Sequence, residues 1–155
     1  EGLFIHYALP VRGGEADDLN MAAVLGFSSE QVQGAVGLLA NETVVQHTFE
    51  NATGIQGDRR DVEDWLGELA NQLLGRIKVE LLRYDINIYL ATPVVLRGVK
   101  LNVAGSQDDG VYKAAFNSDK GDLCVWVDAR HEPDLALEEK EEEEEMAEEG
   151  TGLFF

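Results

Sequence analysis

The sequence contains a single cysteine, Cys124, in a chain of 155 residues. One cysteine cannot form an intrachain disulfide or supply a thiolate-rich zinc site, and this sparse cysteine usage fits a reducing compartment. The three histidines, His6, His47 and His131, lie far apart and share no metal-ligand spacing with one another or with Cys124. We therefore expect no metal site in this chain.

Long hydrophobic runs are also missing. No stretch approaches the roughly 18 to 20 apolar residues that a membrane-spanning helix needs, and the first twenty residues lack the basic and apolar regions of a secretory signal. We therefore expect a soluble, cytoplasmic protein that does not bind a membrane. Because the chain begins with Glu1 and not with methionine, this expectation does not extend to any segment before it.

Basic residues are scarce: 12 Lys and Arg stand against 30 Asp and Glu, which gives a formal net charge of −18. Residues 133–155 carry half of this charge, with ten acidic side chains and one lysine. We interpret them as an acidic C-terminal tail, a solvated charge run that follows a folded domain at 1–132. The domain is itself acidic and would repel nucleic acid, so a protein or small-molecule partner is favoured.

The rest of the composition is that of an ordinary folded domain, with 45% hydrophobic and 27% charged residues. Hydrophobic periodicity and turn residues predict these elements: an edge strand at 3–11, strands at 21–27 and 32–40, a helix at 42–51 with Asn41 as N-cap, a long helix at 61–84, and strands at 86–90, 99–103, 111–116 and 123–128. Tight connections between successive strands imply antiparallel pairing. We therefore expect an α+β fold in which helices cover one face of a predominantly antiparallel sheet.

The long helix is amphipathic. Apolar residues recur every three or four positions from Val62 to Leu81 and predict the face that packs on the sheet. The opposite face carries a stripe that consists of Asp64, Glu68, Asn71, Gly75 and Lys78. Glycine lowers helix propensity by about 1 kcal/mol relative to alanine. Either another protein's backbone approaches at Gly75, or Gly75 packs against an element of its own domain.

The segment from Asp64 to Lys78 resembles the signature helix of the CheC/CheX/FliY phosphatases, and most of all that of their CheX branch. The family pattern is Asp or Ser, three residues, Glu, two residues and Asn, followed by a downstream proline. Asp64, Glu68 and Asn71 match the helix pattern, and Pro93 matches the proline. The resemblance in order and type covers residues 21–128.

The resemblance implies a phosphatase for the aspartyl phosphate of a CheY-like response regulator in chemotaxis or two-component signalling. Glu68 would pair with the regulator's active-site lysine and Asn71 would orient the attacking water, so these two are the expected catalytic residues. Asp64, Gly75 and Lys78 are expected to contact the regulator. The chain would need no cofactor of its own, because the Mg²⁺ would belong to the regulator. The resemblance also favours a homodimer joined through sheet edges.

Two other interpretations stay open. A non-catalytic adaptor of the same fold would bind the regulator without hydrolysing its phosphate. The acidic tail could be anchored through Leu153–Phe155, or could lie over the Glu68 and Asn71 face and regulate access.

An enzyme for a small metabolite has no support, because the sequence lacks the glycine-rich nucleotide motifs and the nucleophile elbow. A second Glu-x-x-Asn is also absent, so we expect one site per chain.

Overall fold

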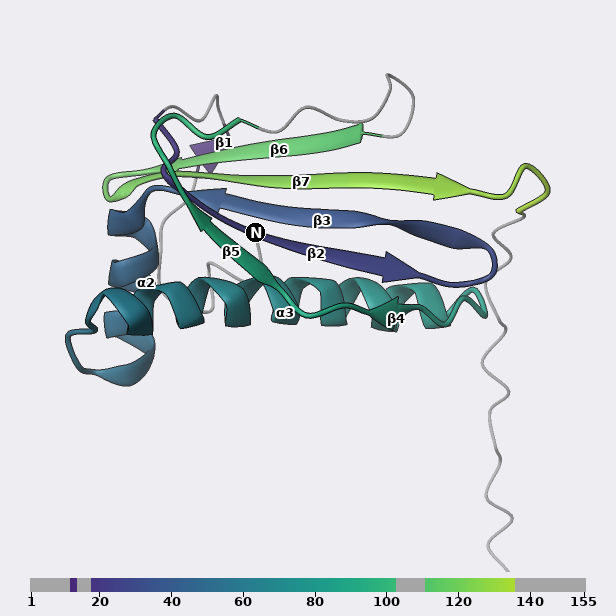
Figure 1. The fold of residues 1–155 in the computed structure, drawn as a ribbon, viewed down its shortest axis with the longest axis horizontal. Helices are drawn as coiled ribbons and strands as arrows, with labels where there is room; N and C mark the ends of the chain where they lie inside the picture. Colours follow the sequence, from purple (N-terminus) through teal and green to yellow (C-terminus); the bar gives the residue numbers. More distant parts are fainter. Residues whose placement is uncertain (1–11, 14–17, 103–110, 136–155) are drawn as a thin grey trace, which may run out of the picture.

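The structure is a computed structural model and describes residues 12–13, 18–102 and 111–135. A single antiparallel sheet forms the framework of these residues. Its seven strands are, in chain order, β1 (Arg12–Gly13), β2 (Met21–Ser28), β3 (Val32–Ala40), β4 (Tyr89–Leu90), β5 (Val94–Arg97), β6 (Val111–Ser118) and β7 (Gly121–His131). They lie in the order β1-β6-β7-β3-β2-β4, and β5 also pairs with β2. Every pairing is antiparallel. Helices α2 (Glu42–Thr53) and α3 (Arg59–Leu82) cover one face (Figure 1), which confirms the expected α+β fold.

Two expectations concern residues outside this description. These are the edge strand expected at 3–11 and the acidic tail beyond residue 135. The division at residue 132 between a domain and a tail therefore stays a prediction. Directly after the residues of the expected edge strand, β1 pairs with β6 at the edge of the sheet.

The hairpin of β2 and β3 follows the sequence closely. Its turn is fixed by Ser29, whose hydroxyl accepts hydrogen bonds from the backbone N–H groups of Gln31 and Val32. Alternate residues of both strands point toward the helices and are buried there: Met21, Ala23, Leu25, Phe27, Val32, Val36, Leu38 and Ala40. The strands predicted at 21–27 and 32–40 are confirmed.

Helix α2 begins at the predicted position, but its first turn is capped differently. Asn41 occupies the N-cap position and makes no side-chain cap hydrogen bond. Its amide instead joins two other segments, accepting from the Asp122 N–H and donating to the Asp18 carbonyl. The Asn20 side chain accepts from the Glu42 N–H at 2.8 Å and takes over the capping role. The prediction of Asn41 as the N-cap residue is therefore confirmed, although tertiary contacts occupy its amide and the Asn20 side chain supplies the capping hydrogen bond.

Helix α3 begins two residues earlier than predicted. Asp58 is its N-cap, and the Asp58 carboxylate accepts from the N–H groups of Arg60 and Asp61. The Asp61 carboxylate accepts in turn from the Asp58 N–H, which completes a capping box. A cap of this kind satisfies N–H groups that would otherwise have no partner at the start of the helix.

The apolar face of α3 packs on the sheet, chiefly on β2, β3 and β5. Its buried side chains belong to the main core: Val62, Leu66, Leu69, Ala70 and Leu74. Trp65 joins α3 to α2, because its indole N–H donates to the Thr48 hydroxyl at 3.0 Å and its ring meets Phe49 edge to face. These contacts fix how α3 is rotated about its own axis.

The opposite face of the sheet carries a second, smaller cluster. Its buried members are Leu19, Ala22, Leu39 and Trp126. Gly37 pairs with Trp126 in the β3 to β7 register, and a Cβ at Gly37 would lie 3.0 Å from the indole ring. The absence of a side chain at Gly37 therefore makes room for Trp126.

The segment between α3 and β6 differs from its prediction. Ile86 and Ile88 are fully buried as expected, but only Tyr89 and Leu90 pair as a strand, and Leu90 is 41% exposed. The alternation of residues 86–90 predicts that Leu90 faces the helices, and its position opposite the buried Phe27 agrees with this. Leu90 is nevertheless exposed, because the short β4 lies at the open edge of the sheet.

The strand predicted at 99–103 lies earlier, at β5, because the free edge of β2 pairs with residues 94–97. The chain then leaves the sheet: Lys100 has a φ of 53° and Val99 is 89% exposed. Residue 103 lies outside the described part. The hairpin of β6 and β7 is confirmed, and both of its strands are longer than predicted.

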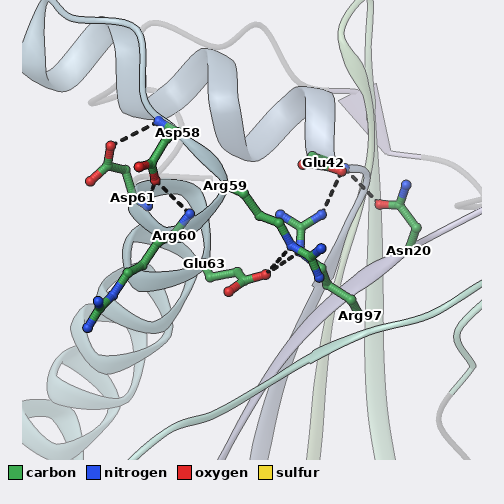
Figure 2. A network of polar contacts seen from close by, with 8 residues as sticks. All are labelled: Asn20, Glu42, Asp58, Arg59, Arg60, Asp61, Glu63 and Arg97. Atoms are coloured by element: carbon green, nitrogen blue, oxygen red, sulfur yellow. Dashed lines mark hydrogen bonds and ion pairs between the residues drawn. The ribbon is translucent and has the colours of Figure 1, made fainter.

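Arg97, at the end of β5, joins the sheet to both helices (Figure 2). Its guanidinium donates to Glu42 at 2.7 Å and also to Glu63, which Arg59 contacts at 3.0 Å. The hydrogen bond from Arg97 lowers the pKa of Glu42, and those from Arg59 and Arg97 lower the pKa of Glu63. This network ties β5 to the first turn of α2 and to the second turn of α3.

Replacing Arg97 should destabilise the fold in a pH-dependent way. Arg97→Met should lower the free energy of unfolding by about 1 to 2 kcal/mol at pH 7, because Glu42 and Glu63 lose their cation while Arg97 is only 21% exposed. Both carboxyls have lowered pKa values in the folded protein. Their contribution is therefore present above the unfolded pKa of about 4.3 and is lost as the pH falls through the folded values.

Urea unfolding of both proteins at pH 7 and near pH 3 tests this, and the difference between them should shrink at the lower pH. Arg83→Met is the matched control, because it removes an ion pair with Glu80 whose two side chains are exposed. Its effect should stay below about 0.5 kcal/mol. Equal losses for the two variants at pH 7 would contradict the bracing role of Arg97.

Candidate functional site

The polar stripe of α3 faces away from the sheet. Asp64, Glu68 and Asn71 are exposed, and Gly75 and Lys78 are half-buried. All five lie on consecutive turns of one helix, as their spacing predicts. The stripe results from the packing described above, since burying Leu66, Leu69 and Leu74 turns the other side of α3 outward.

The two central residues of the stripe have different surroundings. The Glu68 carboxylate accepts one hydrogen bond, from the Gln72 amide at 2.9 Å. The Asn71 side chain has no hydrogen bond within the described residues, so its carbonyl oxygen and its NH₂ group are both available. Asp64 and Lys78 likewise make no ion pair with any described residue.

Pro93 packs on α3 beside this stripe. A Cβ at Gly67 would lie 3.6 Å from the Pro93 ring and 3.6 Å from Val95. Gly67 directly precedes Glu68 and lies one helical turn before Asn71, on one border of the stripe. The proline noted in the sequence therefore contacts the turn that carries both expected catalytic residues.

A shallow hollow opens along the other border of the stripe. It has a volume of about 500 Å³ and is lined by Gln72, Gly75, Arg76, Val79 and Glu80. A Cβ built at Gly75 meets nothing within 4 Å outside the neighbouring backbone of its own helix, so close packing against the described residues does not explain this glycine. Val79 is 61% exposed and gives the hollow an apolar wall.

Four of the residues that line this hollow were not predicted from the sequence, namely Gln72, Arg76, Val79 and Glu80. Only their closeness to Gly75, from one to five residues along the same helix, could have indicated them.

The side chains of the stripe offer two carboxylates, an amide and an amine, and they include no thiol, hydroxyl or imidazole. Cys124 lies on the sheet, and burial raises the pKa of its thiol. The described residues contain no group of three or more His, Cys, Asp or Glu side chains that could hold a metal ion. A carboxylate and a neutral amide can instead anchor a cation and orient a water molecule.

No helix in the described part of the chain is long and apolar enough to cross a membrane.

The sequence matches a known protein family. The family described as "Chemotaxis phosphatase CheX" matches residues 21–117, which is more than half of the chain. No curated protein matches the sequence.

Several solved structures share the fold at low identity. The chemotaxis protein CheX from Vibrio vulnificus is 20% identical with a TM-score of 0.72, over 80% of this chain and 85% of that one. A CheC-like protein from Shewanella oneidensis is 19% identical with a TM-score of 0.73, over 83% of this chain and 90% of that one. The CheX–CheY–BeF₃–Mg²⁺ complex from Borrelia burgdorferi matches at 12% identity with a TM-score of 0.61, over 84% and 97%.

Alanine at position 75 should stabilise the protein. Gly75→Ala places a methyl group where no described atom lies within 4 Å, and alanine is the better helix former by about 1 kcal/mol. Urea unfolding should therefore show a gain of about 0.5 to 1 kcal/mol.

Gly54→Ala is the matched control, because it also meets no described atom but has a φ of 74°. A left-handed conformation penalises alanine, so this variant should lose about 1 kcal/mol. A loss of stability in Gly75→Ala would show that part of the chain itself occupies the space above Gly75.

Proposed function

Because the chain belongs to the CheX chemotaxis phosphatase family, we propose that it removes the phosphoryl group from the active-site aspartate of a CheY-like response regulator. The observation that carries this proposal is the exposure of Glu68 and Asn71 on adjacent turns of α3, with the Asn71 amide unpartnered among the described residues. The solved complex from Borrelia burgdorferi contains both a CheX and a CheY, which supports the same kind of partner here. The protein would act in the cytoplasm, where such regulators work.

Glu68 has the role of an anchor in this proposal. Its carboxylate is exposed, carries no ion pair within the described residues, and projects from a rigid helix. The active-site lysine of a receiver domain is a cation of complementary charge. A charge-assisted hydrogen bond between them would place α3 across the regulator's phosphorylation site.

Asn71 has the role of orienting water. Its carbonyl oxygen can accept from the attacking water while its NH₂ group donates toward the phosphoryl oxygens, and the amide stays neutral beside several negative charges. The water oxygen forms a bond to phosphorus as the bond to the aspartate oxygen breaks. Phosphoryl transfer depends mostly on positioning and charge stabilisation, which an amide and a carboxylate can supply.

The metal ion in this reaction would belong to the regulator. The described residues of this chain offer no cluster for a metal, and the complex from Borrelia burgdorferi includes Mg²⁺ together with CheY. This chain would therefore contribute only side chains to the reaction.

The remaining stripe residues would form the docking surface. Asp64 and Lys78 lie at its two ends without ion pairs to described residues, so both charges are available to a partner. Between them Gly75 opens the hollow, which would admit a side chain or backbone of the regulator.

We also propose that two copies of the chain pair through a sheet edge. β4 and β5 form one edge, since both pair with β2 and with no other strand among the described residues. The large apolar side chains exposed along this edge and in the loop after it are Tyr89, Leu90, Val94, Leu96 and Val99. An apolar strand edge of this kind is suited to pairing with another strand.

The separate roles of Asn71 and Glu68 predict different defects. Asn71→Ala removes the water-orienting amide and keeps the anchor, so the rate of dephosphorylation should fall at least about 100-fold, the usual scale for losing a positioning group. Affinity for the regulator should change little. Glu68→Ala should also weaken binding, by about 1.5 to 3 kcal/mol, because it removes a hydrogen bond to a charged group.

Phosphate release from a CheY-like regulator of the same organism, phosphorylated with acetyl phosphate in Mg²⁺, measures the first effect. Binding to the regulator loaded with beryllium fluoride measures the second. Asn51→Ala is the control, because it removes an exposed asparagine from α2 instead of α3. Parent-like phosphate release by Asn71→Ala would make the phosphatase mechanism wrong, and binding without turnover by the parent would favour an adaptor.

Filling the hollow should block docking. Gly75→Gln adds a side chain where the stripe borders the hollow, so the Kd for the beryllium fluoride-loaded regulator should rise by about tenfold or more, the equivalent of about 1.4 kcal/mol. Gly75→Ala, with one methyl group, should bind more tightly than Gly75→Gln. Equal affinity of Gly75→Gln and the parent would remove Gly75 from the docking surface.

A further inference from the structure

The Glu68 carboxylate is held on one side by its own helix. Gln72 lies one turn farther along α3, and its Nε2 donates to Glu68 Oε1 at 2.9 Å. Within the described residues this is the only hydrogen bond that the carboxylate makes. One oxygen atom of this exposed carboxylate is therefore bound by an amide, and no described residue donates to the other.

The kind of donor at position 72 matters. An amide orients a carboxylate without neutralising it, whereas a lysine at the same spacing would form an ion pair with Glu68 and neutralise the negative charge of its carboxylate. Glutamate has a flexible side chain that loses rotamer freedom when a partner immobilises it. A hydrogen bond formed before docking removes part of that cost and leaves the negative charge available.

Gln72 also lines the hollow beside Gly75. A partner that fills this hollow would exclude water from the Gln72 side chain. Hydrogen bonds strengthen when water is excluded, so docking would reinforce the hydrogen bond that orients Glu68.

We propose that Gln72 is a positioning residue that holds the Glu68 carboxylate in the orientation needed to meet the regulator's cation. This inference rests on the proposed function, and it deepens it by assigning a role to a residue outside the Glu-x-x-Asn pattern. Gln72 acts through Glu68 and does not touch the phosphoryl group.

The test is a double-mutant cycle on phosphate release from the regulator phosphorylated with acetyl phosphate. Gln72→Ala should raise KM by about 2- to 10-fold, the range expected for ordering one side chain on association, and should leave kcat within about twofold. In a Glu68→Ala background the same change should have less than a twofold effect, because the group on which Gln72 acts is gone. An undiminished effect in that background would overturn the proposal.

Gln72→Lys separates orientation from helix stability. A lysine four residues after a glutamate stabilises a helix, so this variant should be at least as resistant to urea as the parent, yet its KM should rise more than that of Gln72→Ala. The matched control is Gln46→Ala, which removes a similar glutamine to glutamate hydrogen bond of 3.0 Å on α2. Its KM should equal that of the parent.

A second measurement does not depend on enzymatic activity. Three-bond scalar couplings of Glu68 should report one dominant χ1 rotamer in the free parent and averaged rotamers in Gln72→Ala. Averaged couplings in the parent would overturn the positioning role, even if the parent is an active phosphatase. If instead the parent releases no phosphate from any CheY-like regulator of the organism, the proposed function fails, and the couplings still decide whether Gln72 orients Glu68.

Discussion

The rotation of α3 about its axis is the constraint on which the site depends. Leu66, Leu69 and Leu74 are buried against the sheet, and each contributes on the order of 1.5 to 3 kcal/mol relative to an exposed side chain. Turning the helix by one residue, about 100°, would move leucines toward water and the polar stripe toward the sheet. The positions of Glu68 and Asn71 in space therefore follow from residues that never contact a partner. This separation lets the exposed side chains vary in chemistry while the fold stays the same.

The two borders of the stripe are built differently. On one border, β5 braces α3: Pro93 and Val95 lie against Gly67, and Arg97 binds Glu63 nearer the start of the helix. On the other border, Gln72, Gly75 and Val79 leave an open hollow. A braced border fixes the height and angle of the turn that carries Glu68. The open border gives a partner room to approach the same turn.

Much of the fold could be predicted from the sequence because patterns among neighbouring residues determine most of its strands and helices. The two hairpins combine alternating strands with short turns, and α3 has a long run of apolar residues at helical spacing. The location of β5 could not be predicted, because Val94 to Arg97 become a strand only through the free edge of β2. The hydrogen-bond partners of the Asn41 side chain could not be predicted for a similar reason, since they are distant in sequence. The stripe could be predicted from the spacing of its residues. The hollow and the hydrogen bond between Gln72 and Glu68 could not, because they depend on side-chain conformations.

The placement of the two tryptophans has a practical consequence. Trp65 is half-buried three residues before Glu68 and is fixed by Thr48, whereas Trp126 is buried on the opposite face of the sheet. The fluorescence of Trp65 therefore comes from a site close to the polar stripe, and that of Trp126 from a site remote from it. Selective quenching by a small solute such as acrylamide would distinguish the two signals, because the more accessible ring lies beside the stripe. The chain thus contains its own optical reporter of events at α3, without an attached dye.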